Sequence, residues 1–304
     1  MKKEIFTINS NIDNLPLSVA VIAPEGDVKG VVQLAHGMAE HKARYFPFME
    51  FLAENGYVTI LHDHRGHGDS VKSKEDWGHY YTNDTSAMVE DTHIMTEYIK
   101  GQYPDKPVYL FGHSMGSLVV RAYLRKYDAE IDKLIVCGAP GKNPAVGAAN
   151  AIIAILKAFK GDRHVSNLMF NLSLGGFNKS VENPRTPCDW LSVNTENVDK
   201  YLADPMCGFG FTLNGYKHLM GVMGECFDEK GWGMANKDIP IFFIAGSNDP
   251  CIGGKDGWLD SQIFLRKMGY TNVDGKLYEG YRHEILQEEI AEEVYKDVLD
   301  FIEK

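Results

Sequence analysis

The chain has 304 residues, of which 44% are hydrophobic and 24% are charged. This composition supports a large buried core and excludes an intrinsically disordered chain. Acidic residues outnumber basic residues by 42 to 31, which gives a formal net charge of −11. Because nucleic acids and anionic membranes bind basic surfaces, we expect neither as an obligatory partner.

Cysteine usage and the distribution of apolar residues bear on the location of the protein. The five cysteines are widely spaced and include no C-x-x-C pair, so we expect no disulfide framework and no structural zinc site. The N-terminal residues lack the apolar run of a signal peptide. The longest apolar-rich stretch, residues 148–159, is shorter than the ~20 residues that span a bilayer. We therefore predict a cytoplasmic protein without an integral membrane span.

In chain order, the sequence begins with two alternating segments joined by an Asn- and Asp-rich turn, which predicts a β-hairpin. Six later runs are short, apolar on both faces and bounded mostly by Gly, Pro or Asp. This pattern is typical of strands that helices cover on both sides. The eight strands are predicted at residues 4–9, 17–23, 30–34, 57–61, 108–111, 133–137, 240–245 and 273–278.

Amphipathic stretches between these runs predict helices. In the last of them, Leu286, Ile290, Val294 and Val298 recur every four residues. The alternation of strands and helices predicts an α/β protein with a mostly parallel eight-stranded sheet and helices on both faces. The helices are predicted at residues 43–55, 84–100, 116–127, 256–268 and 284–303.

The alternation stops between residues 140 and 235, where we expect one helix at 145–160 followed by irregular chain. A stretch of about 95 residues without a convincing strand indicates a cap inserted into the core. We therefore predict a core of residues 1–139 and 236–304 with a cap of residues 140–235. Positive and negative residues balance between 140 and 233, so the net charge resides in the core.

The sequence Gly-His-Ser-Met-Gly at residues 112–116 lies between a predicted strand and a predicted helix. In this context G-x-S-x-G is typical of a sharp turn that exposes a nucleophilic serine. Gly112 and Gly116 are expected because side chains would collide across the turn. We interpret Ser114 as the nucleophile, with the helix N-terminus stabilising a developing oxyanion. The alternative is a structural glycine-rich turn.

A nucleophilic serine needs a base and a carboxylate that orients the base. Asp249 follows the predicted strand at 240–245, and His283 follows the strand at 273–278. This order matches the arrangement expected for such a turn. We assign Asp249 as the orienting acid and His283 as the base, with Asp256 as the reserve acid. The alternatives are a turn at Asp249 and a helix-start role for His283.

The oxyanion intermediate needs two backbone N–H donors. We predict Met115, the residue after the nucleophile, and Met38, which follows His36 and Gly37 in the loop after the strand at 30–34. The alternative for His36 and Gly37 is an ordinary turn that ends a strand.

Together these motifs resemble the α/β-hydrolase superfamily, in particular its monoacylglycerol lipase and lysophospholipase branch of serine aminopeptidase S33-type hydrolases. The resemblance implies the α/β-hydrolase fold with a helical cap, a triad of Ser114, Asp249 and His283, oxyanion donors at Met38 and Met115, and no metal or organic cofactor. It rests on the segments at residues 36–41, 44–45, 63–68, 112–116, 185–191, 204–209, 249–250 and 281–284.

Other chemistries on this fold fit the residues less well. His62, His64 and His67 approach the H-x-H-x-D-H spacing of dinuclear metallohydrolases, but Gly66 stands where the aspartate is needed. We therefore interpret this segment as a polar loop. Dehalogenases and epoxide hydrolases use an aspartate where Ser114 stands, and proline iminopeptidase relatives carry Trp where Met115 stands.

The substrate should be set by the cap. Aliphatic residues that include Ile152 and Leu156 cover most of one helix, and we expect them to pack within the cap, with a lid face that meets acyl chains as the alternative. Phe209 could extend an apolar channel. We also assign His36, Gly37 and Cys251 to substrate binding. We predict hydrolysis of a medium- or long-chain mono-acyl ester, a monoacylglycerol or lysophospholipid, with transient contact between the cap and a lipid surface.

Three alternatives remain open. The enzyme could be a general carboxylesterase or an acyl thioesterase acting on small soluble substrates, or the chain could be a catalytically silent ligand receptor.

Overall fold

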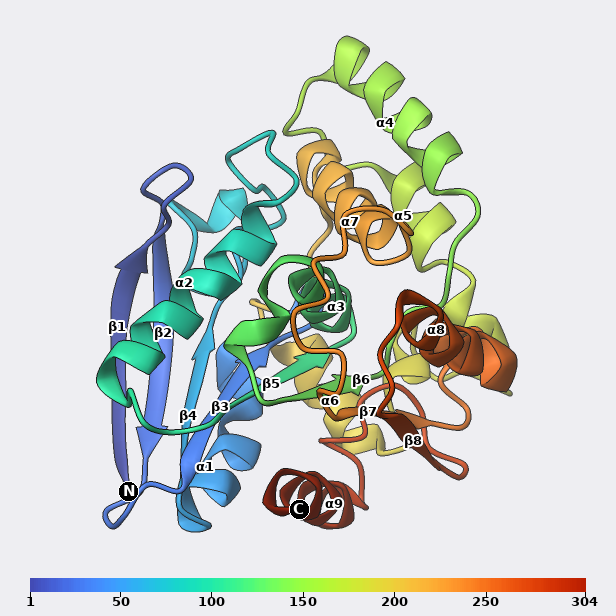
Figure 1. Cartoon of the computed structure of the whole chain (residues 1–304). Helices are drawn as coiled ribbons and strands as arrows, with labels where there is room; N and C mark the ends of the chain where they lie inside the picture. Colours follow the sequence, from blue (N-terminus) through green and yellow to red (C-terminus); the bar gives the residue numbers. More distant parts are fainter.

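The computed structural model describes all 304 residues and contains one eight-stranded sheet with the order β1-β2-β4-β3-β5-β6-β7-β8 (Figure 1). All eight predicted strands are confirmed, each within two residues at either end. The strands are β1 (Lys2–Asn9), β2 (Pro16–Ala23), β3 (Gly30–Ala35), β4 (Tyr57–His62), β5 (Val108–His113), β6 (Lys133–Cys137), β7 (Ile241–Gly246) and β8 (Val273–Tyr278).

The first two strands form the predicted antiparallel hairpin, and β2 also pairs antiparallel with β4. From β4 through β3, β5, β6 and β7 to β8 every neighbouring pair is parallel. The carboxyl ends of these six strands therefore meet at one edge of the sheet, where ligands of open α/β sheets bind.

Helices cover the two faces of the sheet, and each face has its own core. The helices α1 (Phe46–Glu54) and α9 (Ala291–Glu303) contribute to one core, and α2 (Ala87–Gln102), α3 (Met115–Tyr127) and α8 (Gly254–Met268) contribute to the other. Adjacent strand residues point to opposite faces, so neighbours such as Leu110 and Phe111 belong to different cores. This explains why the strands are apolar at consecutive positions.

The last helix starts later than its periodicity predicts. It begins at Ala291, not at residue 284, so Leu286 and Ile290 precede it. The segment before it forms hydrogen bonds with residues 191–194. Glu284 N–H donates to the Leu191 carbonyl (2.8 Å), and the Glu288 carboxylate accepts from backbone N–H groups of residues 193 and 194 (2.7 and 3.1 Å). These long-range bonds replace the first turns of a helix.

Between β6 and β7 the chain leaves the sheet, and we call residues 138–240 the insertion. The helix predicted at 145–160 is confirmed as α4 (Val146–Lys160). The expectation of irregular chain beyond it is wrong, because three more helices follow. They are α5 (Asn167–Ser173), α6 (Thr195–Ala203) and α7 (Leu213–Glu225).

Side-chain caps explain where these three helices start. Ser166 accepts from Met169 N–H, Asn194 from Glu196 N–H and Thr212 from Gly215 N–H, and each side chain satisfies a donor that has no partner within its helix. Figure 1 shows α4, α5 and α7 above α3, on the side of the molecule away from α9. None of the helices combines the length and the apolar character that a membrane span requires.

The turn from β5 to α3 passes close to the end of β3. A Cβ atom on Gly116 would lie 2.1 Å from the Ala35 carbonyl oxygen and 2.7 Å from the His36 carbonyl oxygen. A Cβ on Gly112 would lie 2.5 Å from the Gly116 carbonyl oxygen. The two glycines therefore let the turn sit against the loop that follows β3.

We expect Gly116→Ala to lower the free energy of unfolding by about 1–3 kcal/mol, because the new methyl group overlaps backbone atoms that must shift. Urea unfolding measures this loss. Gly101→Ala is the matched control: it lies in α2 with no atom within 4 Å of its Cβ position. This control should raise the free energy by about 0.5–1 kcal/mol. Equal effects of the two substitutions would contradict the steric explanation.

Candidate active site

Ser114 lies at the tip of the turn between β5 and α3. Its φ of 53° and ψ of −118° place a non-glycine residue in a backbone region that L-residues rarely adopt. The surroundings hold this conformation: Ser114 N–H donates to the Cys137 carbonyl (3.0 Å), and the Ser114 carbonyl accepts from Ser117 Oγ (2.6 Å). Ser114 also lines the largely apolar cavity described below, in keeping with the exposed serine that the G-x-S-x-G context predicts.

The structure brings Asp249 and His283 together, although 34 residues separate them. Nδ1 of His283 donates to Oδ2 of Asp249 at 2.8 Å, and both side chains are buried. Oδ1 of Asp249 accepts from the Cys251 N–H at 2.8 Å, which fixes the carboxylate. Asp256, the reserve acid, is exposed in the first turn of α8.

The electrostatic environment of His283 has two opposing contributions. Burial by itself would lower the pKa of the imidazole, but the adjacent Asp249 carboxylate, together with Glu284 and Glu40, outweighs burial, and the pKa is raised above its usual value. An imidazole with this partner can hold the proton that a serine hydroxyl releases.

The insertion holds the loop that carries His283, a feature that sequence reasoning missed. Arg282 Nη1 donates to the carbonyls of Asp189 (2.7 Å) and Ser192 (3.0 Å), on one side of His283. Glu284 N–H donates to Leu191 on the other side. The Trp190 ring lies against the imidazole with ring centroids 5.0 Å apart. The insertion therefore fixes the position of the histidine.

A buried ionic network joins the loop after β3 to the histidine loop, and it was also missed. Glu40 Oε1 accepts from Gly37 N–H (2.6 Å) and from the Tyr45 hydroxyl (2.7 Å), while Oε2 accepts from Arg44 (2.7 Å). Arg44 also makes a two-pronged pair with Glu284, each contact at 2.7 Å. The motif residues at 40, 44–45 and 284 were all visible in the sequence, but the pairing of Arg44 with Glu284 was not.

Burial opposes the charge on Glu40, but hydrogen bonding to His113 and the charge of Arg44 hold the pKa of this carboxyl well below its usual value. Glu40 is therefore a charged anchor for the loop that carries Met38. Asn197 of α6 completes the network by donating to Glu284 Oε2 at 2.7 Å.

The two predicted oxyanion donors, Met38 and Met115, line the same cavity as Ser114. Met115 is the first residue of α3, so its N–H has no acceptor within the helix. The Gly37 N–H is used by Glu40 and the Ala39 N–H by His67 Nε2 (3.2 Å), whereas the Met38 N–H makes no hydrogen bond. The geometry leaves the two predicted N–H groups free to bind an oxygen.

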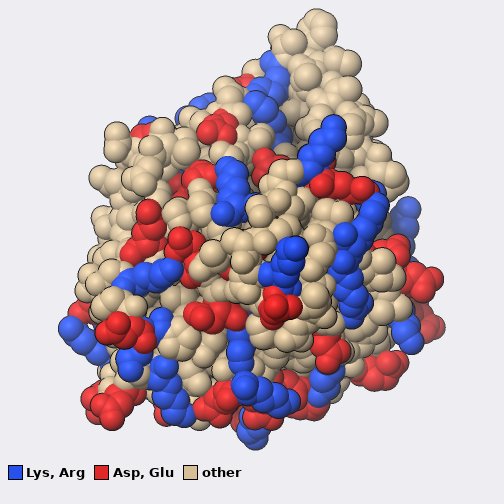
Figure 2. Space-filling model, in the orientation of Figure 1, with Lys and Arg blue, Asp and Glu red and all other residues tan.

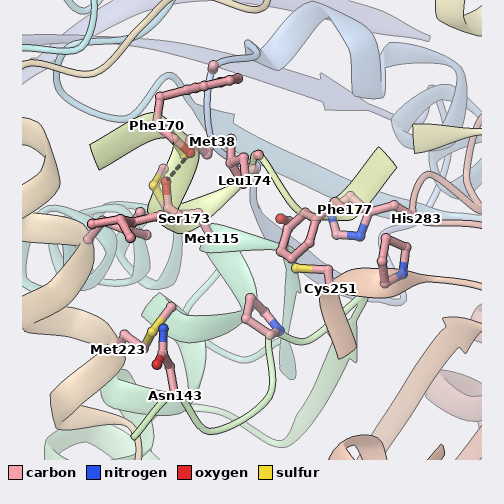
Figure 3. Close-up of a pocket in the computed structure, with 18 of the residues that line it drawn as sticks. Met38, Met115, Asn143, Phe170, Ser173, Leu174, Phe177, Met223, Cys251 and His283 are labelled. Atoms are coloured by element: carbon pink, nitrogen blue, oxygen red, sulfur yellow. Dashed lines mark hydrogen bonds between the residues drawn. The ribbon is translucent and has the colours of Figure 1, made fainter. Parts of the chain in front are cut away.

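The site lies in a cavity of about 860 Å³, whose lining includes Met38, Ser114, Met115 and His283. In all, 41 residues line this cavity, and 22 of them are hydrophobic. Figure 3 shows Met38, Met115, Cys251 and His283 around the same cavity as Phe170, Leu174 and Phe177 of the insertion. The volume lies within the range of small-molecule sites, and the lining suits an apolar ligand.

Most residues assigned to substrate binding line this cavity, namely Gly37, Ile152, Phe209 and Cys251. Two do not. His36 is fully buried behind the site, where Nδ1 donates to the Gly37 carbonyl (2.8 Å) and Nε2 accepts from His64 N–H (2.9 Å). Leu156 packs against the hydrophobic core from the next turn of α4.

The histidines at 62, 64 and 67 are buried and pack against one another by their ring faces and edges. His67 Nδ1 donates to the Arg65 carbonyl (3.0 Å). Burial lowers the pKa of His62 to about 3 and that of His67 to about 4. Their nitrogens are not gathered within reach of one ion, so the structure supports the interpretation as a polar loop.

Comparison with known proteins identifies the family to which the chain belongs. The profile of the family described as "Serine aminopeptidase, S33" matches residues 26–290. The monoacylglycerol lipase of Mycolicibacterium smegmatis is 29% identical over 282 residues, which cover 93% of this chain and 91% of that protein. The human monoglyceride lipase is 26% identical over 284 residues, which cover 93% of this chain and 84% of that protein.

A solved structure shows the same overall likeness. The thermostable carboxyl esterase from Bacillus coagulans in complex with glycerol is 28% identical and superposes with a TM-score of 0.90, covering 100% of this chain and 98% of that chain. The protein is thus an α/β-hydrolase of the ester-hydrolysing kind. It belongs to the serine aminopeptidase S33 family, in its monoglyceride lipase-like branch.

We expect Asp249→Asn to reduce kcat by about 10⁴-fold, because the amide no longer holds the imidazole in the reactive tautomer. His283 must be neutral to accept a proton, so activity falls when the pH drops below its raised pKa. Without the carboxylate, burial lowers this pKa, and the acid limb of the kcat/KM profile should move to lower pH.

The pH profile with a soluble ester measures both effects. Asp256→Asn is the matched control and should leave kcat and the profile unchanged. A large loss in the control, or an acid limb that stays in place in Asp249→Asn, would contradict the assignment of the acid.

Proposed function

We propose that the protein is a serine hydrolase that cleaves mono-acyl lipid esters through an acyl-enzyme. One observation carries the proposal: His283, which is paired with the buried Asp249, and the strained Ser114 line the same large and mostly apolar cavity. A polar catalytic end with an apolar lining suits a substrate with one ester bond and one long acyl chain.

In the first half of the proposed reaction, Ser114 Oγ attacks the ester carbonyl while His283 Nε2 accepts the hydroxyl proton. The carbonyl oxygen becomes an oxyanion, which the N–H groups of Met38 and Met115 bind. The carbon–oxygen bond to the alcohol then breaks, and His283 gives its proton to the departing alcohol oxygen.

In the second half, a water molecule attacks the acyl-enzyme, and His283 takes one of its protons. Collapse of the second oxyanion breaks the bond to Ser114 Oγ, which recovers its proton from His283. The products are a free fatty acid and an alcohol, so the balance of atoms requires only water as co-reactant.

We further propose that residues 140–235 act as a cap that selects the substrate. The cap supplies many apolar lining residues, which include Ile152, Met169, Phe170 and Phe209. Relatives named monoacylglycerol and monoglyceride lipases support a small alcohol such as glycerol.

The five unpaired cysteines fit the reducing, cytoplasmic location predicted for the protein.

The outer surface of α4 supports contact with a lipid surface. Ile155 is 59% exposed and Phe159 is 86% exposed, and Leu168 and Leu172 nearby are also exposed. Figure 2 shows few charged side chains on the projecting part of the molecule, in contrast to its lower face. Exposed apolar groups on an electrically balanced cap can enter the interface of a lipid aggregate.

Labelling with a fluorophosphonate probe tests the nucleophile, and turnover of competing substrates tests the specificity. We expect labelling of the wild type and none of Ser114→Ala, together with preferred hydrolysis of monoacylglycerol over lysophospholipid and acyl-CoA. Absence of labelling in folded wild-type protein would show a silent receptor. Activity that peaks at acetate esters without monoacylglycerol turnover would indicate a general carboxylesterase.

We expect Phe159→Ser to weaken sedimentation with uncharged phosphatidylcholine vesicles that contain monoacylglycerol, by about 10-fold, since burial of an aromatic side chain contributes ~1.5–3 kcal/mol. Hydrolysis of a soluble short-chain ester should not change. Ile263→Ser is the matched control, because Ile263 is exposed on α8, away from the cap. Equal losses in both variants would exclude specific docking through α4.

A further inference from the structure

A second cluster of metal-binding side chains lies outside the catalytic triad, at the junction between the insertion and the sheet. His41 follows Glu40 in the loop after β3, and Asp204 and Cys207 follow α6. His41 Nε2 lies 2.9 Å from Asp204 Oδ2. The ligand atoms of all three side chains lie within 4.8 Å of one another.

The donor set and its spacing suit a transition metal. Imidazole nitrogen, thiolate sulfur and carboxylate oxygen are all common zinc ligands. Tetrahedral zinc with ordinary bond lengths places such ligand atoms about 3.3–3.6 Å apart. The three side chains therefore need only small movements to surround one ion, with water at the fourth position.

The Cys207 thiol must lose its proton to bind an ion. Burial raises the pKa of this thiol, and the carboxylates of Glu40, Asp204 and Glu284 raise it further against the opposing charge of Arg44, so the thiol is protonated when no ion is bound. On binding, the Cys207 S–H bond breaks, a metal–sulfur bond forms and the thiol proton passes to solvent. The proton that His41 Nε2 donates to Asp204 moves to Nδ1, which frees the Nε2 lone pair for the ion.

The two segments that carry the ligands are already held together. The Ala39 carbonyl accepts from Gly208 N–H (2.9 Å) and from the Tyr201 hydroxyl (3.1 Å), so the ligand-bearing loops keep a fixed separation. The Asp204 side chain is 31% exposed, which gives an ion access from solvent, whereas that of His41 is buried.

Although the spacing of the cysteines predicts no structural zinc site, we propose that His41, Asp204 and Cys207 form a binding site for Zn²⁺ or a similar divalent transition metal. The ion fastens the segment after α6 to the loop that carries Met38, and it stabilises the junction between the insertion and the sheet. This site is distinct from the triad, and metal binding there takes no part in ester hydrolysis.

The protein offers an internal comparison. Asp249, Cys251 and His283 also place their ligand atoms within 4.8 Å of one another. An ion there would occupy the catalytic base, so metal inhibition alone cannot distinguish the two clusters. Cys207→Ser and Cys251→Ser remove one thiol from each cluster and therefore separate them.

The test uses the chelator-treated full chain, with Co²⁺ as a spectroscopic substitute and Zn²⁺ for thermal unfolding. We expect one Co²⁺ per chain with a thiolate-to-metal charge-transfer band. Zn²⁺ at 100 times its Kd should raise Tm by about 4 °C. Both signals should persist in Cys251→Ser and disappear in Cys207→Ser.

The variant His41→Gln provides a second, independent test of the site through its Co²⁺ affinity. This test remains available if Cys207→Ser does not fold. The variant keeps both thiols, and we expect at least a 10-fold weaker Co²⁺ affinity. The proposal is overturned if folded wild-type protein shows neither the band nor the Tm shift. It is equally overturned if Cys251→Ser, and not Cys207→Ser or His41→Gln, abolishes them.

Discussion

The arrangement of the site depends on the Arg44 guanidinium, which lies between the carboxylates of Glu40 and Glu284. Glu40 fixes the loop that carries Met38, and Glu284 directly follows His283, so one cation sets the spacing between the predicted oxyanion donor and the predicted base. Buried ion pairs of this kind contribute little net stability when complete, but removal of one partner typically costs about 3–5 kcal/mol. The network therefore specifies one geometry for the two loops.

The inner and outer parts of the insertion have different structural roles. The segment around Trp190 and α6 contacts the histidine loop through backbone hydrogen bonds and through Asn197. The outer helix α4 leaves large apolar side chains in solvent, with Ile153 as its only fully buried residue. Change in the outer part can alter what enters the cavity, while the inner part keeps the imidazole in place.

The strands and the motif order could be predicted from the sequence because both depend on local pattern. Consecutive apolar residues mark strands covered on two faces, and the turn at 112–116 needs its glycines wherever it occurs.

The start of the last helix and the ionic network could not be predicted in this way. Arg44 and Glu284 are 240 residues apart, and no local pattern shows that Glu284 pairs with a distant arginine and lies outside the predicted last helix. The helices α5 and α6 were missed because they are short, at 7 and 9 residues, and their caps resemble ordinary turn residues. The 13-residue α7 was missed because its three glycines weaken the helical pattern. Leu156 was misplaced because an aliphatic helix does not show which of its sides faces a cavity.

The position of the insertion in the sheet has a consequence for how such proteins diversify. The strands β6 and β7 are parallel neighbours, with Leu134 beside Ile241, so the chain must return from one end of the sheet to the other between them. A crossover of this kind is obligatory, but its length is not fixed, because lengthening a connection adds little closure entropy. The insertion is thus an enlarged version of a connection that the sheet requires in any case. Because this connection lines much of the cavity, changes in its length and sequence can reshape the cavity while the order of strands and the turn at Ser114 stay as they are.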